Sequence, residues 1–253
     1  MEAILYICHG SRIKIACDEA ISFVKICMEQ NPVSIQEYCF LELSDPTIEE
    51  AYERCVKRGA TKITVLPVLL LTAVHAKEDI PNELDRIRKG FPEVEMVYGR
   101  PIGVHHHMID ILMERLQETG EELNGDSMVL LIGRGSSDPD VKRDLSQIAQ
   151  LLEEKTGLNR VDTCYLTAVD PDLEQGLQAA KQSPYKKVFI IPYLLFTGIL
   201  MNTIQKTLKS DYAEGDKEFI LCHYLGYHPL IGDILQERFT ELSGGNGRVS
   251  HHA

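Results

Sequence analysis

The amino-acid sequence contains two copies of one pattern, and this internal repeat limits the possible folds more than any other feature. A shift of 125 residues aligns the same turn residues in both copies, and past residue 91 the shift becomes 123. The matched positions are Gly10 with Gly135, Ser11 with Ser136, Asp45-Pro46 with Asp170-Pro171, Pro67 with Pro192, Gly103 with Gly226 and His105 with His228. Repetition at such a spacing predicts a duplication, with two structurally similar halves.

Each half alternates short β-branched apolar runs with longer amphipathic segments. This alternation predicts βαβ units around a mostly parallel sheet, because parallel neighbours need a crossover connection. The expected strands are residues 3–8, 34–41, 62–67 and 94–98 in the first half and 128–132, 160–165, 187–192 and 219–222 in the second. The helices expected in the first half are 15–29, 47–58, 77–89 and 107–119.

The polar stretch 120–126 separates the two copies and is the expected domain boundary. The predicted fold is α/β, with two pseudo-symmetric halves at 1–120 and 127–243, each a mostly parallel four-stranded sheet flanked by helices. Ligands of open parallel sheets bind beyond the carboxyl ends of the strands, so we expect a cleft between the halves. One chain would then enclose one cleft as a monomer, followed by a mobile tail at 244–253.

Charge and cysteine usage exclude several classes of protein. The 26 basic and 38 acidic residues give a net charge of −12, the wrong sign for binding nucleic acid or an anionic membrane. The most apolar run, VFIIPYLLFTGILM, is interrupted by Pro192 and Gly198 and does not read as a membrane span. The seven cysteines are scattered without a CxxC pair, so we expect reduced thiols and a cytoplasmic location.

Three polar residues follow the first three expected strands. His9 comes directly after the first strand, Glu42 after the second, and His75 lies in the loop after the third. Because the carboxyl ends of parallel strands meet at one edge of a sheet, these side chains can converge. Two imidazoles and a carboxylate suit a divalent first-row metal ion that keeps open coordination positions.

Taken singly, each of the three has a structural explanation as a turn, cap or loop residue. The repeat supplies a comparison. The residues at the equivalent positions of the second half are Arg134, Thr167 and Leu200. The second half keeps the turns without the triad, so turn geometry alone does not require these side chains. This favours a function for the set.

A glycine-rich turn, GRGSSDP at 133–139, precedes a helix in the second half. Backbone N–H groups at such a turn bind carboxylates or phosphates, and the guanidinium of Arg134 adds a fork-shaped donor. The alternative is an ordinary tight turn in which a serine or an aspartate caps the helix. The turn matches neither a P-loop nor a dinucleotide-binding fingerprint.

Residues 105–107 are three histidines, which invites a metal-site interpretation. Adjacent residues entering a helix are expected to point in different directions. His105 also has a repeat partner in His228, and this favours a structural role. We expect no role for the two tail histidines at 251–252.

Several runs around these residues are distinctive. They are LYICHGSR at 5–12, FLELSDPTI at 40–48, VLPVLLLTAVHAKEDIP at 65–81, LIGRGSSDPD at 131–140 and PYLLFTG at 192–198. Together they resemble the class II chelatases, the family of sirohydrochlorin ferrochelatases and cobaltochelatases, in its long two-domain bacterial form. The likeness covers nearly all of residues 1–243. Cys8 departs from the glycine expected there but leaves the His-Gly-Ser unit intact.

The resemblance implies two fused α/β chelatase domains that insert Fe²⁺ into sirohydrochlorin, the last step of sirohaem synthesis, with release of two protons. It places His9, Glu42 and His75 at the family's metal-binding and catalytic positions. The imidazoles would present the metal and take up pyrrole protons, while Glu42 would balance charge and pass protons onward. The metal is a substrate, and no tightly bound cofactor is expected.

The implied tetrapyrrole substrate carries many carboxylates, so an acidic protein needs donors concentrated where the substrate binds. The candidates for these contacts are Ser11, Arg12, Arg134, Ser136 and Ser137.

Three alternatives to iron insertion stay open. Two imidazoles and a carboxylate accept Co²⁺ and Ni²⁺ as well as Fe²⁺, so a cobaltochelatase of cobalamin synthesis is one alternative. A carrier that binds metal or tetrapyrrole without catalysis is another. A histidine phosphatase also has a nucleophilic histidine before a glycine near the first strand, but it needs an arginine where this chain has Cys8.

Overall fold

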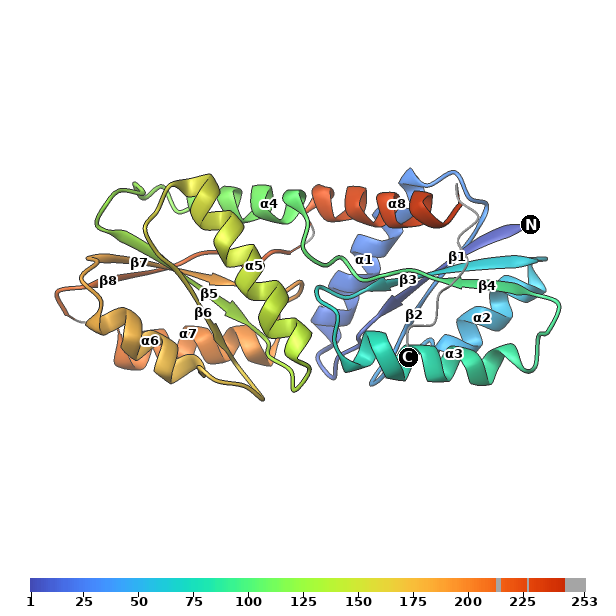
Figure 1. Ribbon diagram of the computed structural model, residues 1–253. Helices are drawn as coiled ribbons and strands as arrows, with labels where there is room; N and C mark the ends of the chain where they lie inside the picture. The colour runs from blue at the N-terminus through green and yellow to red at the C-terminus, as the bar shows by residue number, and fades with distance from the viewer. Residues whose placement is uncertain (213–214, 227, 244–253) are drawn as a thin grey trace. The chain divides into compact units, whose positions relative to one another are not determined.

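The computed structural model (Figure 1) describes residues 1–212, 215–226 and 228–243. The predicted mobile tail and its two histidines lie outside the described residues. The elements in chain order are β1 (Glu2–Cys8), α1 (Lys14–Gln30), β2 (Ile35–Phe40), α2 (Ile48–Lys57), β3 (Lys62–Val68), η1 (His75–Asp79), α3 (Ile80–Arg88), β4 (Glu95–Tyr98), α4 (His106–Gln117), β5 (Ser127–Gly133), α5 (Pro139–Thr156), β6 (Val161–Tyr165), α6 (Leu173–Gln182), β7 (Lys187–Pro192), α7 (Ile199–Asp211), β8 (Glu218–Leu221) and α8 (Pro229–Ser243).

The strands form two four-stranded sheets in which every pairing is parallel. Their strand orders are β2-β1-β3-β4 and β6-β5-β7-β8. This confirms the predicted fold class, and each expected strand is present to within one residue at either end. The central strands β1 and β5 are buried along almost their whole length, as parallel strands covered by helices on both faces should be.

The loops of the two halves share unusual details, which supports the duplication. The peptide bonds before Pro46 and Pro171 are both cis. The helix that follows begins with a reciprocal capping box in each half, made by Thr47 with Glu50 and by Asp172 with Gln175.

The chain divides into two compact units, and the last helix of each repeat packs in the unit formed mainly by the other repeat. The first unit comprises Met1–Gly103 with Ile231–Ala253, and the second comprises Val104–Leu230. Helix α4 therefore packs in the second unit, against α5 and β7, although it belongs to the first copy of the repeat. The compact units thus differ from the repeat halves that meet at 120–126. A boundary inferred from the linker marks the duplication and does not reveal which helix covers which sheet.

Two buried arginines hold the exchanged helices. Arg238 of α8 donates to the carbonyl oxygens of Pro101 at 3.3 Å and Ile102 at 2.8 Å in the first unit. Arg115 of α4 donates to the carbonyl oxygen of Leu225 at 2.9 Å in the second unit. Both arginines and both loops are related by the repeat. Each guanidinium therefore satisfies backbone carbonyls in the loop that follows a sheet's last strand.

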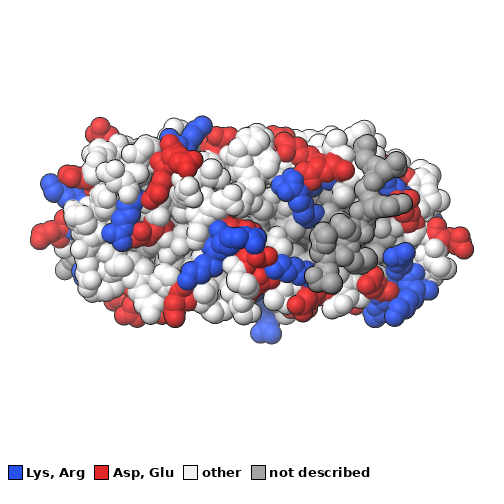
Figure 2. Space-filling view, in the orientation of Figure 1, with Lys and Arg blue, Asp and Glu red and all other residues white. Residues whose placement is uncertain are grey.

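Cysteine pairing, surface charge and helix length can be compared with the expectations drawn from composition. All seven cysteines are unpaired and buried. On the face shown in Figure 2, acidic and basic side chains are interspersed rather than gathered into one basic field. No helix within the described ranges is long and apolar enough to cross a membrane. The cytoplasmic location and the monomeric state stay predictions.

Replacing Arg238 by alanine should destabilise the first unit. The substitution leaves the buried carbonyls of Pro101 and Ile102 without their donor, so the free energy of unfolding should fall by about 3 kcal/mol. Urea unfolding followed by circular dichroism measures the change. Arg86→Ala is the control, because Arg86 forms its ion pairs with Glu49 and Glu83 at the surface, where they contribute little. Equal effects of the two substitutions would contradict the role given to Arg238.

Candidate metal centre

The loops after β1 and β2 are hydrogen-bonded to each other beyond the ends of their strands. The backbone N–H of Leu41 donates to the carbonyl of Cys8 at 2.8 Å, and that of Glu42 donates to the carbonyl of His9 at 3.1 Å. The parallel pairing therefore continues past the sheet edge. It places Glu42 beside His9, the first residue after β1.

Gly10 permits this close approach. Its φ is +94°, and a Cβ at this position would lie only 1.8 Å from the carbonyl oxygen of Glu42. Gly135 repeats the arrangement in the second half, with φ +89° and a Cβ position 2.0 Å from the carbonyl oxygen of Thr167. Only glycine satisfies both the backbone angle and the contact.

Side chains fasten the same two loops a little further along. The Ser44 hydroxyl donates to the carbonyl of Ser11 at 3.0 Å, and the Cys17 thiol donates to the same carbonyl at 3.2 Å. Ser11 in turn accepts the N–H of Ile13 through its hydroxyl at 3.1 Å, which shapes the turn into α1. The backbone around His9 and Glu42 is thus fixed from both sides.

His75 begins a single π-helical turn, η1, before α3. Its Nδ1 lies 2.7 Å from Oδ2 of Asp79, four residues later. The hydroxyl of Tyr98, at the end of β4, donates to the carbonyl of Ala76 at 3.0 Å and supports this turn. Single π turns occur frequently at functional sites. The expected helix at 77–89 is therefore η1 followed by α3.

The structure brings the three predicted residues together. The His9 and His75 rings meet edge to face, with centroids 4.9 Å apart, and Nε2 of His9 lies 3.7 Å from Oε1 of Glu42. One potential ligand atom from each residue lies within 4.8 Å of the other two. The side chains of His9, Glu42 and His75 are 25%, 46% and 30% exposed, so the group is open to solvent on one side.

Hydrogen bonds fix which nitrogen each imidazole offers. His9 Nδ1 lies 3.1 Å from the Gly10 carbonyl, and a carbonyl only accepts, so this Nδ1 carries the proton. The Asp79 carboxylate requires the same of His75 Nδ1. In the neutral form of each ring, the lone pair that can bind a metal is therefore on Nε2. Burial raises the pKa of the Cys8 thiol to about 12, which keeps it protonated at neutral pH.

The proposed substrate-contacting residues lie on loops at the carboxyl ends of the strands. Arg12, Arg134 and Ser137 are exposed. The Ser136 hydroxyl accepts the N–H of Asp138 at 3.1 Å, and the Asp138 side chain caps α5. The second-half turn thus has the capping bonds of an ordinary tight turn, and its contact with a substrate stays a prediction.

The histidine run 105–107 differs from expectation, because its rings lie together. The three ring centroids are 4.1 to 5.1 Å apart at the start of α4. The prediction that they point in different directions is therefore wrong. His105 Nδ1 accepts the N–H of His107 at 3.2 Å, and His228 accepts that of Leu230 at 3.3 Å at the start of α8. These matching bonds agree with a structural role for this position.

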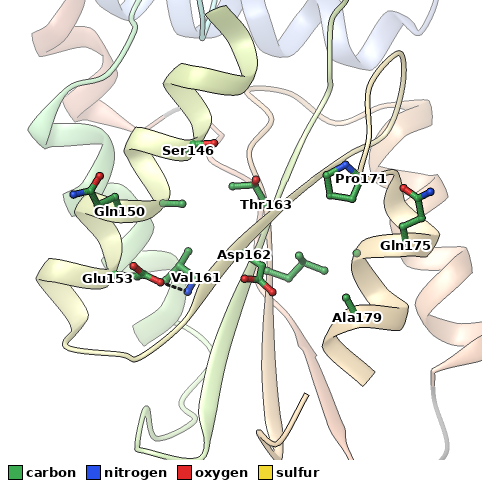
Figure 3. Close-up of a pocket in the computed structure, with 12 residues that line it drawn as sticks. Ser146, Gln150, Glu153, Val161, Asp162, Thr163, Pro171, Gln175 and Ala179 are labelled. Carbon is green, nitrogen blue, oxygen red and sulfur yellow. Dashed lines mark hydrogen bonds between the residues drawn. The ribbon is translucent and has the colours of Figure 1, made fainter. Parts of the chain in front are cut away.

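A separate hollow of about 390 Å³ lies over β6 in the second unit, between α5 and α6 (Figure 3). Gln150 and Glu153 border it on one side and Gln175 on the other. Glu153 already accepts the backbone N–H of Val161 at 2.7 Å. The lining contains no basic side chain and none of the predicted site residues. It therefore does not suit a carboxylate-rich ligand.

Comparison with known proteins decides the family. The CbiX family matches residues 3–119 and again residues 128–242. The chain belongs to the CbiX family. Its two matches coincide with the two copies of the repeat, and the chelatase resemblance predicted from the sequence is confirmed.

Relatives of this CbiX protein span nearly its whole length. The sirohydrochlorin ferrochelatase of Priestia megaterium is 51% identical over 247 residues, covering 98% of this chain and 92% of the relative. The sirohydrochlorin cobaltochelatase of the same organism is 39% identical over 255 residues, covering 99% and 83%. The structure of SirB from Bacillus subtilis with Fe³⁺ superposes with a TM-score of 0.88 at 43% identity, covering 95% and 94%.

Sequence reasoning about this CbiX protein missed Asp79. In the sequence it resembles any acid at the start of a helix, where such side chains are common. Its spacing of four from His75 is the available signal, because residues four apart lie on the same face of a helical segment. Metal-ligating histidines commonly donate their second ring N–H to a carboxylate.

Replacing Gly10 by alanine should disrupt the metal centre. The added methyl group cannot share space with the Glu42 carbonyl, so the two loops must separate and Co²⁺ affinity should fall at least about tenfold. Titration of visible Co²⁺ absorption measures this. Gly103→Ala is the matched control, since Gly103 also has a positive φ of 71° but its nearest contact is 3.8 Å away. Unchanged affinity in Gly10→Ala would contradict the argument.

Replacing Asp79 by alanine should weaken metal binding without unfolding the protein. The His75 ring loses the partner that fixes its orientation and tautomer, so Co²⁺ affinity should fall by about 10- to 100-fold. The same Co²⁺ titration measures the effect, with Asp85→Ala, an exposed acid on α3, as the control for lost negative charge. Similar losses in both variants would indicate a general charge effect and remove Asp79 from the site.

Proposed function

We propose that this chain is a sirohydrochlorin ferrochelatase, which inserts Fe²⁺ into sirohydrochlorin and releases two protons. The observation that carries the proposal is the group of His9, Glu42 and His75 at one sheet edge, with ligand atoms within 4.8 Å of one another. Three protein ligands leave coordination positions open on a first-row metal ion. An enzyme that transfers its metal to a substrate needs such open positions. The family and its ferrochelatase member support this reaction.

The chemistry explains the need for two histidines. Insertion replaces two pyrrole N–H protons with one dication, so the site must release a metal and accept protons at nearly the same place. One nitrogen lone pair cannot bind the metal and a proton together. With two Nε2 atoms, each imidazole can bind the metal before transfer and take one of the two pyrrole protons once the metal has left it. Glu42, half exposed and 3.7 Å from His9 Nε2, offsets the resulting positive charge and passes the proton towards solvent.

Iron is favoured over cobalt by comparison within one organism. The ferrochelatase of Priestia megaterium is 51% identical to this chain, whereas its cobaltochelatase is 39% identical. The donor set itself accepts Fe²⁺, Co²⁺ or Ni²⁺. We therefore take Fe²⁺ as the physiological substrate and Co²⁺ insertion as the alternative, with no tightly bound cofactor.

The substrate carboxylates need donors outside the metal site. We propose that the exposed side chains of Arg12 and Arg134 attract them. The turns that contain Ser11, Ser136 and Ser137 present backbone N–H groups at the same ends of their sheets. An exposed arginine at a strand end in each unit supplies positive charge for an anionic substrate despite the net charge of −12.

The decisive experiment follows metal insertion directly. Under anaerobic conditions, the absorption spectrum of sirohydrochlorin with Fe²⁺ should change much faster with the protein than without it. His9→Ala and His75→Ala should each lose at least about 100-fold in rate, because each removes a metal ligand and a base. Parallel runs with Co²⁺ compare the two metals.

Other outcomes would select the alternatives. Tight binding of sirohydrochlorin or metal without faster insertion would indicate a carrier. Hydrolysis of a generic phosphate ester that depends on His9 would indicate a phosphatase. Faster insertion of Co²⁺ than of Fe²⁺ would favour the cobaltochelatase assignment.

A further inference from the structure

Apolar side chains remain exposed beside the metal centre. Among the described residues of the first unit, the large apolar side chains with half or more of their surface exposed are Met1, Ile15, Ile26 and Leu43. Leu43, 51% exposed, directly follows Glu42, and Ile15, 59% exposed, lies in the first turn of α1. Leu43 therefore lies on a loop that forms the site, and Ile15 lies at the start of the helix that follows the His9 loop.

Hydrogen bonds join the two chain segments on which Leu43 and Ile15 lie. Leu43 precedes Ser44, and Ile15 lies two residues before Cys17. The Ser44 hydroxyl and the Cys17 thiol are 3.1 Å apart, and both donate to the Ser11 carbonyl. The two apolar residues thus flank the contact that fastens the His9 loop to the Glu42 loop.

The backbone of Leu43 has an unfavourable conformation for leucine. Its φ is 64°, in the left-handed region where glycine or asparagine is the usual residue. The equivalent residue of the second half, Ala168, has a φ of 68°. The turn therefore imposes this backbone in both halves, but it does not require a large side chain. The leucine is found in the half that has the metal-binding triad.

We propose that Leu43, together with Ile15, contacts the apolar face of the tetrapyrrole macrocycle. The inference rests on the proposed function and names how that substrate is held. A tetrapyrrole has flat apolar faces and carboxylates at its rim, so a site needs apolar contact near the metal and charged donors further out. Leu43 directly follows Glu42 in the chain, and its side chain is 51% exposed, so it is accessible to a ring that approaches the metal.

Leu43→Ala tests the proposal by introducing the residue of the second half. The KM for sirohydrochlorin should rise about tenfold, since the ring loses most of one leucine contact, while the KM for Fe²⁺ and the Co²⁺ affinity stay unchanged. Leu43→Gly should raise the KM similarly although glycine accepts the left-handed backbone, so misfolding cannot explain the loss. Ile26→Ala, on the same helix as Ile15 and 50% exposed, should leave every constant unchanged.

Two results would overturn the inference. An unchanged KM for sirohydrochlorin in both Leu43→Ala and Ile15→Ala would show that the ring does not contact them. A loss of Co²⁺ affinity in Leu43→Ala would assign the residue to the support of the metal centre instead. Titrating metal-free sirohydrochlorin with the protein and following its fluorescence measures ring binding without metal insertion. This measurement tests the Leu43 contact separately from the proposed reaction. If the unaltered protein binds the ring about tenfold more tightly than Leu43→Ala yet does not insert metal, the contact stands and the ferrochelatase proposal fails.

Discussion

The approach of two backbone segments at Gly10 is the constraint on which the metal centre depends. The Glu42 carbonyl occupies the place where a Cβ would be, and the Glu42 N–H bonds to the His9 carbonyl. His9 and Glu42 are 33 residues apart in the sequence, and main-chain contacts therefore make them neighbours. Side-chain attraction is not needed to bring them together. The ligands are preorganised by the sheet, which lowers the cost of ordering them around a metal.

The second half shows which parts of this arrangement are scaffold. It keeps the glycine, the close carbonyl, the cis Asp-Pro bond and the left-handed residue, but it has Arg134 and Thr167 where the first half has His9 and Glu42. The same backbone therefore supports a metal centre in one half and a cationic loop in the other. This separation fits the general rule that function resides in side chains placed on a fold that many sequences share.

Sequence reasoning found the strands and the triad because both depend on local patterns. Apolar runs followed by a polar residue mark the carboxyl end of a buried parallel strand, and His9 and Glu42 lie there. Three features depend on geometry that the local pattern alone does not decide. Asp79 resembles any acid at a helix start, the rings of 105–107 come together through the cap formed by His105, and the place of α4 depends on a distant loop around Leu225.

The exchange of helices has a consequence for how the protein is synthesised. The first unit contains the proposed metal-binding triad, yet it also includes α8, which is translated after the whole second unit. During synthesis the second unit has every segment it needs once residue 230 has left the ribosome. The first unit lacks the donor to the carbonyls of Pro101 and Ile102 until Arg238 has been translated. The unit that begins first is therefore the last to have all its segments, and the proposed metal centre belongs to that unit.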